Sequence, residues 1–285
     1  PHKGGRLTLP GNVSSQYISA LLMTGPVLQE GLTLELTGEI ISRPYIDLTL
    51  KLMKDYGAEA EWTGGHCIRV APVPYRPIPY YIENDWSAAS YWYEMMALAA
   101  DTEAEVVLTG LFADSPQGDS AVRNLFEPLG VHTEFLNRDG VSCVRLTRRP
   151  RDIRRMEYDF TGQPDLAQTL VVTCAMLGLP FHFSGLQSLK IKETDRIAAL
   201  IRELGKLGYP LHEAHGSELY WEGDRIPAEA QPAIDTYEDH RMAMAFAPCS
   251  LALPSIRIND PQVVSKSYPR YWDHLRAAGF EIDTL

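Results

Sequence analysis

The sequence has 285 residues, and Asp and Glu outnumber Lys and Arg by 37 to 26, which gives a formal net charge of −11. Hydrophobic residues make up 45% and charged residues 22%, values of an ordinary globular protein that exclude a disordered, collagen-like or coiled-coil chain. The acidic balance argues against a nucleic-acid partner, and no apolar run reaches the roughly 18 residues of a membrane helix.

Four segments of the chain share one pattern. A short strand ends at a Gly or Asp, a polar loop follows, and an amphipathic helix leads to a second Gly. The strands are predicted over 32–38, 105–110, 180–185 and 255–260, and the helices after them end near Gly57, Gly130, Gly208 and Gly279. The marker residues Gly38, Gly110, Gly185 and Asp260 lie 72, 75 and 75 residues apart. This spacing predicts an internal structural repeat.

Each repeat is preceded by a helix with a polar start and an almost wholly apolar body. These helices are predicted to begin at Ser14-Ser15-Gln16, Asp85-Trp86-Ser87, Pro164-Asp165 and Asp239-His240-Arg241. Ser, Asp and Pro are favoured at helix starts, and a helix that is apolar on all sides, as over 91–100 and 242–253, is buried. With further strands at 67–71 and 141–146, helices and strands alternate, which predicts an α/β (α+β) fold of mixed sheets around buried parallel helices.

A Pro-rich stretch, formed by Pro72, Pro74, Pro77 and Pro79, is the predicted domain boundary. It divides the chain into residues 1–80, the remaining repeat of an N-terminal domain, and residues 81–285, a C-terminal domain of three repeats. The chain opens at Pro1 without an initiating Met. We therefore expect the sequence to be truncated at its N-terminus.

The four cysteines are far apart in the sequence, at Cys67, Cys143, Cys174 and Cys249. None forms a CxxC pair or lies at zinc-ligand spacing from a His, so they are interpreted as reduced thiols of a cytoplasmic protein. The sequence also lacks a phosphate-binding loop and a GxGxxG motif. We expect no metal and no cofactor.

Polar residues at the helix starts are the candidate binding residues, because helix N-termini present free N–H groups that attract anions. Ser14, Ser15 and Gln16 form one such group, and Ser42 with Tyr45 forms another. Each group can equally be a simple helix cap or turn. In either case these residues are expected at the edge where the buried helices begin.

Charged residues dominate the later helix starts. Asp165 follows Pro164. The run Lys192–Arg196, with Lys190 just before it, has the highest density of charged residues in the chain. Lys192 and Arg196 lie at i and i+4, so we expect both on one face of a helix, where two cations suit a dianionic ligand. Glu193 lies beside Arg196, while Arg241 can clamp a carboxylate or phosphate. His240 and Lys266 complete the set, although a capped, solvated helix start is the alternative interpretation of these runs.

Taken together, these segments resemble the 5-enolpyruvylshikimate-3-phosphate (EPSP) synthases. The resemblance spans nearly the whole chain in family order and rests on Ser14-Ser15-Gln16-Tyr17, Ser42-Arg43-Pro44-Tyr45, Gln117-Gly118-Asp119, Pro164-Asp165, Lys192-Glu193-Thr194-Asp195-Arg196, Asp239-His240-Arg241 and Asp260-Pro261 with Lys266. It implies a two-domain fold of βαβαββ repeats. It also implies transfer of an enolpyruvyl group from phosphoenolpyruvate to the 5-hydroxyl of shikimate 3-phosphate.

The resemblance also assigns roles to the candidate residues. Those expected to hold shikimate 3-phosphate are Ser14, Ser15, Gln16, Ser42, Tyr45, Asp165, Ser188 and Lys192, and those expected to hold phosphoenolpyruvate are Gln16, Arg196, Arg241 and Lys266. Catalysis would fall to Asp165, which takes the hydroxyl proton, and to Glu193 with His240 and Lys266, which serve proton transfer at the methylene carbon. Ser188 stands where the family often has Asn.

The family's chain extends further at its N-terminus, where a Lys and a Gly-Asn-Ala-Gly-Thr loop help to grip phosphoenolpyruvate. Neither is found here, so this polypeptide is expected to be inactive or weakly active, and monomeric. Two alternatives remain: a relative that transfers enolpyruvate to UDP-N-acetylglucosamine, and a noncatalytic anion-binding fragment.

Overall fold

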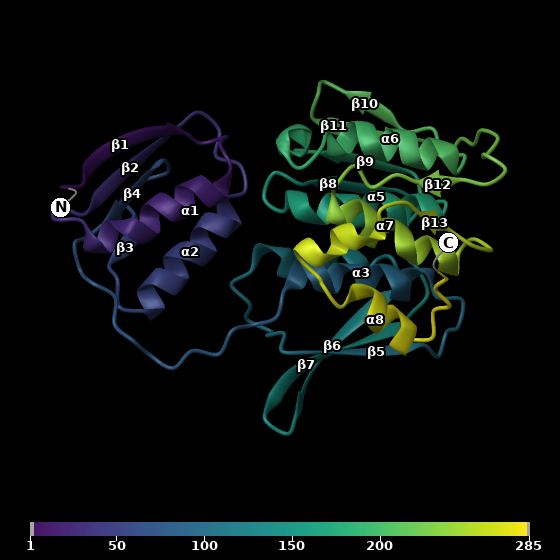
Figure 1. The fold of residues 1–285 in the computed structure, drawn as a ribbon, viewed down its shortest axis with the longest axis horizontal. Coiled ribbons are helices and arrows are strands. Elements are labelled where there is room, and N and C mark those ends of the chain that lie inside the picture. The colour runs from purple at the N-terminus through teal and green to yellow at the C-terminus, as the bar shows by residue number, and fades with distance from the viewer. Residues whose placement is uncertain (1–2, 284–285) are drawn as a thin grey trace. The chain divides into compact units, whose positions relative to one another are not determined.

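The computed structural model describes residues 3–283, so Pro1 lies outside the described residues. Its contacts divide it into two compact units (Figure 1). The N-terminal unit runs to Asn84 and takes in Phe112–Ser120 and Thr161–Gln163. The C-terminal unit comprises Asp85–Leu111, Ala121–Phe160 and the chain from Pro164 onward.

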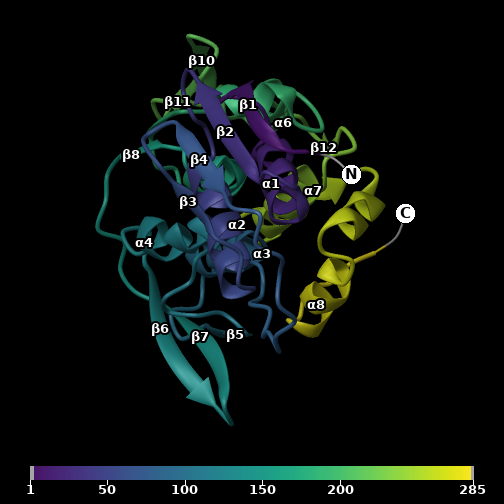
Figure 2. The ribbon, with the colours of Figure 1, turned by 90° about the vertical axis from the view of Figure 1, so that its left-hand side faces the viewer.

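The N-terminal unit is built on one βαβαββ repeat. Its elements are β1 (Gly5–Pro10), α1 (Ser15–Thr24) with a 3₁₀ turn (Gly25–Val27), β2 (Leu32–Thr37), α2 (Arg43–Asp55), β3 (Ala60–Trp62) and β4 (Cys67–Val70). The sheet order is β1-β2-β4-β3, in which β1 and β2 are parallel and the other pairs antiparallel. Alternate residues of β2 are buried, as a half-buried strand requires. Helices α1 and α2 lie together on one face of this sheet (Figures 1 and 2).

The C-terminal unit contains a second repeat with the same topology. Its elements are β8 (Met156–Asp159), a 3₁₀ turn (Pro164–Leu166) that leads into α5 (Ala167–Met176), β9 (Phe181–Ser184), a second 3₁₀ turn (Gln187–Ile191), α6 (Arg196–Lys206), β10 (His212–Ala214) and β11 (Glu218–Trp221). The sheet order is β8-β9-β11-β10, again with only the first pair parallel. The predicted repeat and mixed sheets are therefore confirmed.

The remaining elements form two partial repeats, which lie in the C-terminal unit except for Gly118–Ser120 of the N-terminal unit. The first consists of α3 (Trp86–Leu98), β5 (Glu105–Thr109), a 3₁₀ turn (Gly118–Ala121), α4 (Val122–Phe126), β6 (Val131–Arg138) and β7 (Val141–Arg148). The second consists of β12 (Ala233–Ile234), α7 (His240–Phe246) with a 3₁₀ turn (Ala247–Leu251), β13 (Arg257–Ile258), another 3₁₀ turn (Pro261–Lys266) and α8 (Tyr271–Ala277). Strands β12 and β13 pair in parallel, as β1 and β2 do.

The four marker residues of the repeat share one backbone conformation. Gly38, Gly110, Gly185 and Asp260 follow the equivalent strands of the four repeats, and their φ angles are 71°, 73°, 71° and 49°. Glycine adopts this left-handed region without steric cost, and Asp is among the residues that tolerate it best. The repeat is therefore visible in the sequence because one turn needs a positive φ.

Two expected elements are shorter than the sequence suggested. The strand expected over 255–260 is only Arg257–Ile258. The helix expected over 242–253 is α-helical only to Phe246 and then becomes 3₁₀. The reason is Pro248, which has no N–H to donate to the carbonyl of Met244. The hydroxyl of Tyr271 donates to that carbonyl instead, at 2.8 Å.

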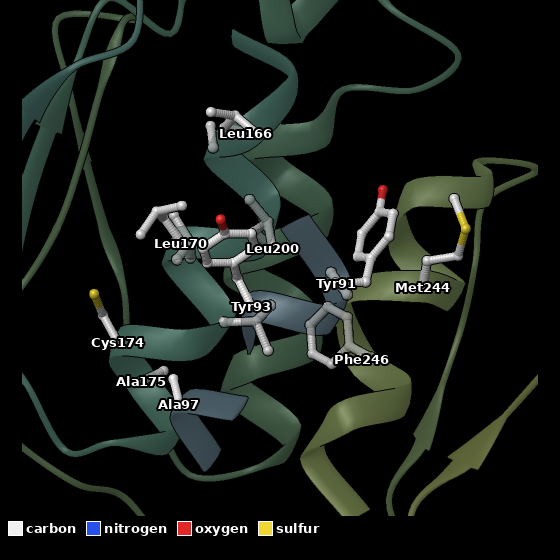
Figure 3. Close-up of a cluster of buried hydrophobic side chains, with 14 of the residues drawn as sticks. Tyr91, Tyr93, Ala97, Leu166, Leu170, Cys174, Ala175, Leu200, Met244 and Phe246 are labelled. Atoms are coloured by element: carbon white, nitrogen blue, oxygen red, sulfur yellow. The ribbon is translucent and has the colours of Figure 1, made fainter. Parts of the chain in front are cut away.

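The core of the C-terminal unit is a layer of buried helices. Side chains of α3, α5, α6 and α7 meet there (Figure 3). Nine of the ten residues of α5, Ala167 to Ala175, are buried, which confirms the prediction from its apolar sequence. Within residues 3–283, none of the helices combines the length and apolarity needed to span a bilayer.

Replacing Leu170 tests this core. Its side chain is fully buried in α5, so Leu170→Ala should lower the free energy of unfolding by about 2–5 kcal/mol. Urea unfolding followed by circular dichroism measures the change. Ile226 is 46% exposed, and Ile226→Ala serves as the control with little expected loss. Equal losses in both variants would contradict the assignment of Leu170 to the core.

Candidate functional site

Asp165 lies just before α5, in the C-terminal unit, and its carboxylate contacts three cationic side chains. One carboxylate oxygen accepts a hydrogen bond from Arg241 at 2.9 Å. The other accepts from Arg196 at 3.3 Å and lies 3.6 Å from the ammonium of Lys192. The side chain is 20% exposed and thus only partly buried.

Arg196 is the centre of the cluster, and its side chain is only 1% exposed. Helix α6 begins at this residue because the carboxylate of Asp195 accepts from the amide of Ala198 at 3.0 Å and caps the helix. The guanidinium donates to Asp239 at 2.7 Å and to Glu193 at 2.7 Å, in addition to Asp165. Three carboxylates from three chain segments therefore converge on one buried cation.

Helix α7 supplies the next part of the site. Asp239 is its N-cap, fully buried, and accepts from the amide of Arg241 at 2.9 Å. The Arg241 guanidinium contacts Asp165 and donates to the hydroxyl of Tyr91 at 3.4 Å. Burial raises the pKa of Tyr91 to about 12, so this phenol stays protonated beside Arg241.

Glu193 links the cluster to Lys266, which is 73 residues further along the chain and donates to this carboxylate at 3.0 Å. Burial alone raises the pKa of Glu193, but the positive charges of Arg196 and Lys266 outweigh it and lower the pKa to about 2. In the same way, Arg241, Lys192 and Arg196 outweigh burial and hold the pKa of Asp165 far below its ordinary range. Both carboxylates are therefore ionised at neutral pH.

His240 is buried next to this network, with Nδ1 3.8 Å from a carboxylate oxygen of Asp239. Burial and the charge of Arg241 lower the pKa of the imidazole. A neutral ring at this position can accept or relay a proton.

The structure corrects the expectation that Lys192 and Arg196 share a helix face. Lys192 is extended and ends the 3₁₀ turn of 187–191, whereas α6 begins only at Arg196, because Asp195 caps the helix there. The two cations still converge, since both face Asp165. Ser188 is buried in the same 3₁₀ turn.

The predicted hydroxyl residues belong to the N-terminal unit. Ser14 caps α1, and its hydroxyl accepts from the amide of Gln16 at 3.4 Å. Ser15 is the first residue of that helix and is partly buried, while Gln16 is exposed. Because β1 and β2 are parallel, the helices that follow them begin at the same edge of the sheet. Ser14 to Gln16 and Ser42 to Tyr45 therefore lie at one edge of this unit.

Ser42 has a left-handed backbone, with φ 57°, and is buried. Its amide donates to the carbonyl of Thr161 at 2.9 Å. The hydroxyl of Tyr45 donates to Asp119 at 2.7 Å. These contacts inside the N-terminal unit hold the backbone of Ser42 and the side chain of Tyr45.

Sequence reasoning missed two members of the cluster. The sequence marks Asp239 only as part of a helix start, although a carboxylate directly before His240 and Arg241 is a usable signal of a charged site. Tyr91 lies in an apolar helix body, where a single phenol gave no signal of its own. In the network defined by these contacts, four cations meet three carboxylates, which leaves an excess positive charge for an anionic ligand.

Known proteins resemble this chain in sequence and in fold. The sequence model of one family, EPSP synthase (3-phosphoshikimate 1-carboxyvinyltransferase), matches residues 1–275. The chain belongs to the EPSP synthase family. Proteins named 3-phosphoshikimate 1-carboxyvinyltransferase from two strains of Bacteroides fragilis are each 58% identical over 279 residues, which cover 98% of this chain and 67% of the relative.

More distant proteins also resemble the chain. The protein of that name from Cellvibrio japonicus is 36% identical over 272 residues, covering 94% of this chain and 61% of the relative. The structure of EPSP synthase from Acinetobacter baumannii aligns with a TM-score of 0.73 at 21% identity, over 99% of this chain and 64% of that one. This likeness confirms the enolpyruvyl transferase fold. The chain spans about two thirds of the length of these proteins.

The low pKa of Glu193 makes the stability of the chain depend on pH. A carboxyl whose pKa falls from 4.5 to about 2 on folding stabilises the folded state above pH 4.5, and that contribution is lost as the pH falls towards 2. Glu193→Gln should therefore lower the free energy of unfolding more at pH 6 than at pH 3. Urea unfolding at both pH values measures the difference.

The control for this measurement is Glu281→Gln, which replaces an exposed carboxylate near the C-terminus. Its effect should be small at both pH values. A loss from Glu193→Gln that is the same at pH 3 and pH 6 would contradict the ion pairing of Glu193 in the folded chain.

Proposed function

We propose that the protein to which this chain belongs transfers the enolpyruvyl group of phosphoenolpyruvate to the 5-hydroxyl of shikimate 3-phosphate. The convergence of Arg196, Arg241, Lys192 and Lys266 on Asp165 and Glu193 carries this proposal. It combines cations for a ligand with a phosphate and a carboxylate and two ionised carboxylates for proton transfer. Family membership and the names of the relatives support the same reaction.

The roles proposed for the single groups follow from the resemblance to the family. Arg196, Arg241 and Lys266 would bind phosphoenolpyruvate, with Gln16 of the N-terminal unit. Lys192 and Ser188 would bind shikimate 3-phosphate, together with the hydroxyl groups of the N-terminal unit. We propose that the N-terminal unit, which carries these hydroxyl groups, forms part of the N-terminal domain of the whole protein.

The reaction requires addition followed by elimination. The 5-hydroxyl oxygen attacks C2 of phosphoenolpyruvate while the methylene carbon gains a proton, which gives a tetrahedral intermediate. Loss of inorganic phosphate and of a proton from the new methyl group then restores the double bond. Asp165 would take the hydroxyl proton, and Glu193, with Lys266 and His240 beside it, would serve the methylene carbon.

Proton transfer by these carboxylates needs a change in their surroundings. The pKa of Asp165 is far below its ordinary value in the present ion pairs, so the carboxylate is a weak base. An anionic substrate that binds Arg241 or Lys192 would weaken those pairs and raise the pKa of Asp165. Substrate binding would thus activate the base.

Turnover is the direct test. Incubation with phosphoenolpyruvate and shikimate 3-phosphate, followed by proton NMR, should show enol-ether vinyl signals in step with phosphate release. The family's further phosphoenolpyruvate contacts have no match in these 285 residues, so we expect slow turnover by this polypeptide but measurable affinity for shikimate 3-phosphate. UDP-N-acetylglucosamine in its place tests the related activity. Binding of that nucleotide sugar and not of shikimate 3-phosphate would contradict the proposal.

Arg241 tests the phosphoenolpyruvate assignment. Arg241→Lys keeps the charge but loses the planar fork, so affinity for phosphoenolpyruvate should fall by about 10- to 100-fold, as expected for one charge-assisted hydrogen bond or more. Affinity for shikimate 3-phosphate should change less than about threefold, a difference worth below 1 kcal/mol. Calorimetry measures both.

Arg155→Lys is the matched control, because Arg155, directly before β8, pairs with the exposed Glu222, directly after β11. It should leave both affinities unchanged. Equal loss of both ligands in Arg241→Lys would contradict the separate roles.

A further inference from the structure

Glu203 is a fully buried carboxylate of α6 that has no role in the chemistry above. One oxygen accepts from the hydroxyl of Tyr237 at 2.5 Å. The other accepts from the amide of Asp235 at 3.0 Å and lies 2.7 Å from the ammonium of Lys206. Apart from Lys206, these partners belong to the short segment 235–238.

The segment 235–238 leads directly into the start of α7. Tyr237 and Glu238 both have left-handed backbones, with φ 53° and 58°. Two consecutive residues other than glycine rarely adopt this conformation, so surrounding contacts must hold it. The next residue is Asp239, whose carboxylate caps α7 and pairs with Arg196.

One face of α6 holds both ends of this segment. Arg196 and Glu203 lie seven residues apart, which places them on the same side of a helix. Arg196 pairs with Asp239, the residue directly after the segment. Glu203 accepts hydrogen bonds from Asp235 and Tyr237 within the segment. The segment therefore cannot shift along α6 without breaking a buried charged contact.

The same segment is tied to the strand that precedes Lys266. Asp235 accepts from the side-chain amide of Asn259 at 2.7 Å and from Lys206 at 2.9 Å. Asn259 directly follows the strand β13 and precedes Asp260, the left-handed residue before the 3₁₀ turn that carries Lys266. Glu203 is thus connected through hydrogen bonds to both chain segments that supply cations from beyond α6.

We propose that Glu203 is a positioning residue of the anion site: through Tyr237 and Asp235 it sets the place of Asp239, and thereby of Arg196 and Arg241. The phosphoenolpyruvate role of these arginines rests on the function proposed above, whereas their placement by Glu203 does not. Position 203 requires a carboxylate, because both side-chain oxygens accept hydrogen bonds and one of them also contacts the ammonium group of Lys206. Glutamine at this position has the same shape but presents an NH₂ group to a donor.

The experiment compares Glu203→Gln and Tyr237→Phe in the full 285-residue chain. Tyr237→Phe removes one hydrogen bond and keeps the buried ion pair, so it provides a variant that folds if the first does not. Val144→Ala is the control, because Val144 is fully buried in β7 and contacts none of the site residues by a hydrogen bond or ion pair. Thermal unfolding identifies the loss of stability in each variant.

Two readouts are needed. Calorimetry measures affinity for phosphoenolpyruvate, with inorganic phosphate as a second probe, and NMR follows the ring signals of His240 and the Nε–H signal of Arg196. Glu203→Gln should weaken phosphoenolpyruvate binding at least tenfold, equivalent to about 1.4 kcal/mol, and Tyr237→Phe should weaken it less. Both variants should shift the NMR signals, and Val144→Ala should leave affinity and signals unchanged.

The two readouts separate this inference from the proposed function. Wild-type chain that binds neither phosphoenolpyruvate nor phosphate would count against the function, while shifted His240 and Arg196 signals in the two variants would still support positioning. Unshifted signals in both variants, or an equal change in Val144→Ala, would overturn the positioning role.

Discussion

The charged site depends on the burial of one guanidinium, that of Arg196. Arginine stays charged in a protein interior, and its five N–H donors need acceptors there. Asp239, Glu193 and Asp165 supply them from the starts of α7 and α5 and from the loop before α6. No single acceptor can be withdrawn without leaving a buried charge underpaired, a change that is strongly destabilising. One side chain therefore joins the three chain segments.

The repeat explains why these segments are available at one place. Helices α1 and α5 are equivalent in their repeats, as are α2 and α6, since the two sheets have the same order and pairing. Each helix begins after a strand of a parallel pair, so the starts within a repeat share an edge. In the N-terminal unit these starts carry hydroxyl groups, at Ser14 and Ser42. In the C-terminal unit they carry charges, at Asp165 and Arg196. One architecture thus presents two kinds of polar group.

Local patterns were sufficient to predict the repeat and the helix starts. Caps such as Asp85 and Asp239 act within three residues, and the left-handed turn at Gly38 and its equivalents leaves a direct trace in the sequence. The contacts of the site were less predictable. Whether Lys192 and Arg196 shared a helix depended on where Asp195 capped it. Two partners of Glu203, Asp235 and Tyr237, lie more than 30 residues away in the sequence. The division at residue 80 and the roles of the site residues stay predictions, because they concern the whole protein and its ligands.

An acidic chain with a net charge of −11 can attract an anion only where positive charge is concentrated locally. Four cations placed side by side would repel one another, and the carboxylates of Asp165, Glu193 and Asp239 offset that repulsion. Asp239 is fully buried and stays with Arg196, whereas Asp165 and Glu193 remain partly accessible and can be replaced by ligand oxygens. Under the proposed function, a ligand with two anionic groups replaces both carboxylates at once, while a monoanion replaces only one. Under that proposal, the ion pairs that stabilise the cluster of charges also favour a dianionic ligand, and its binding would free two carboxylate bases.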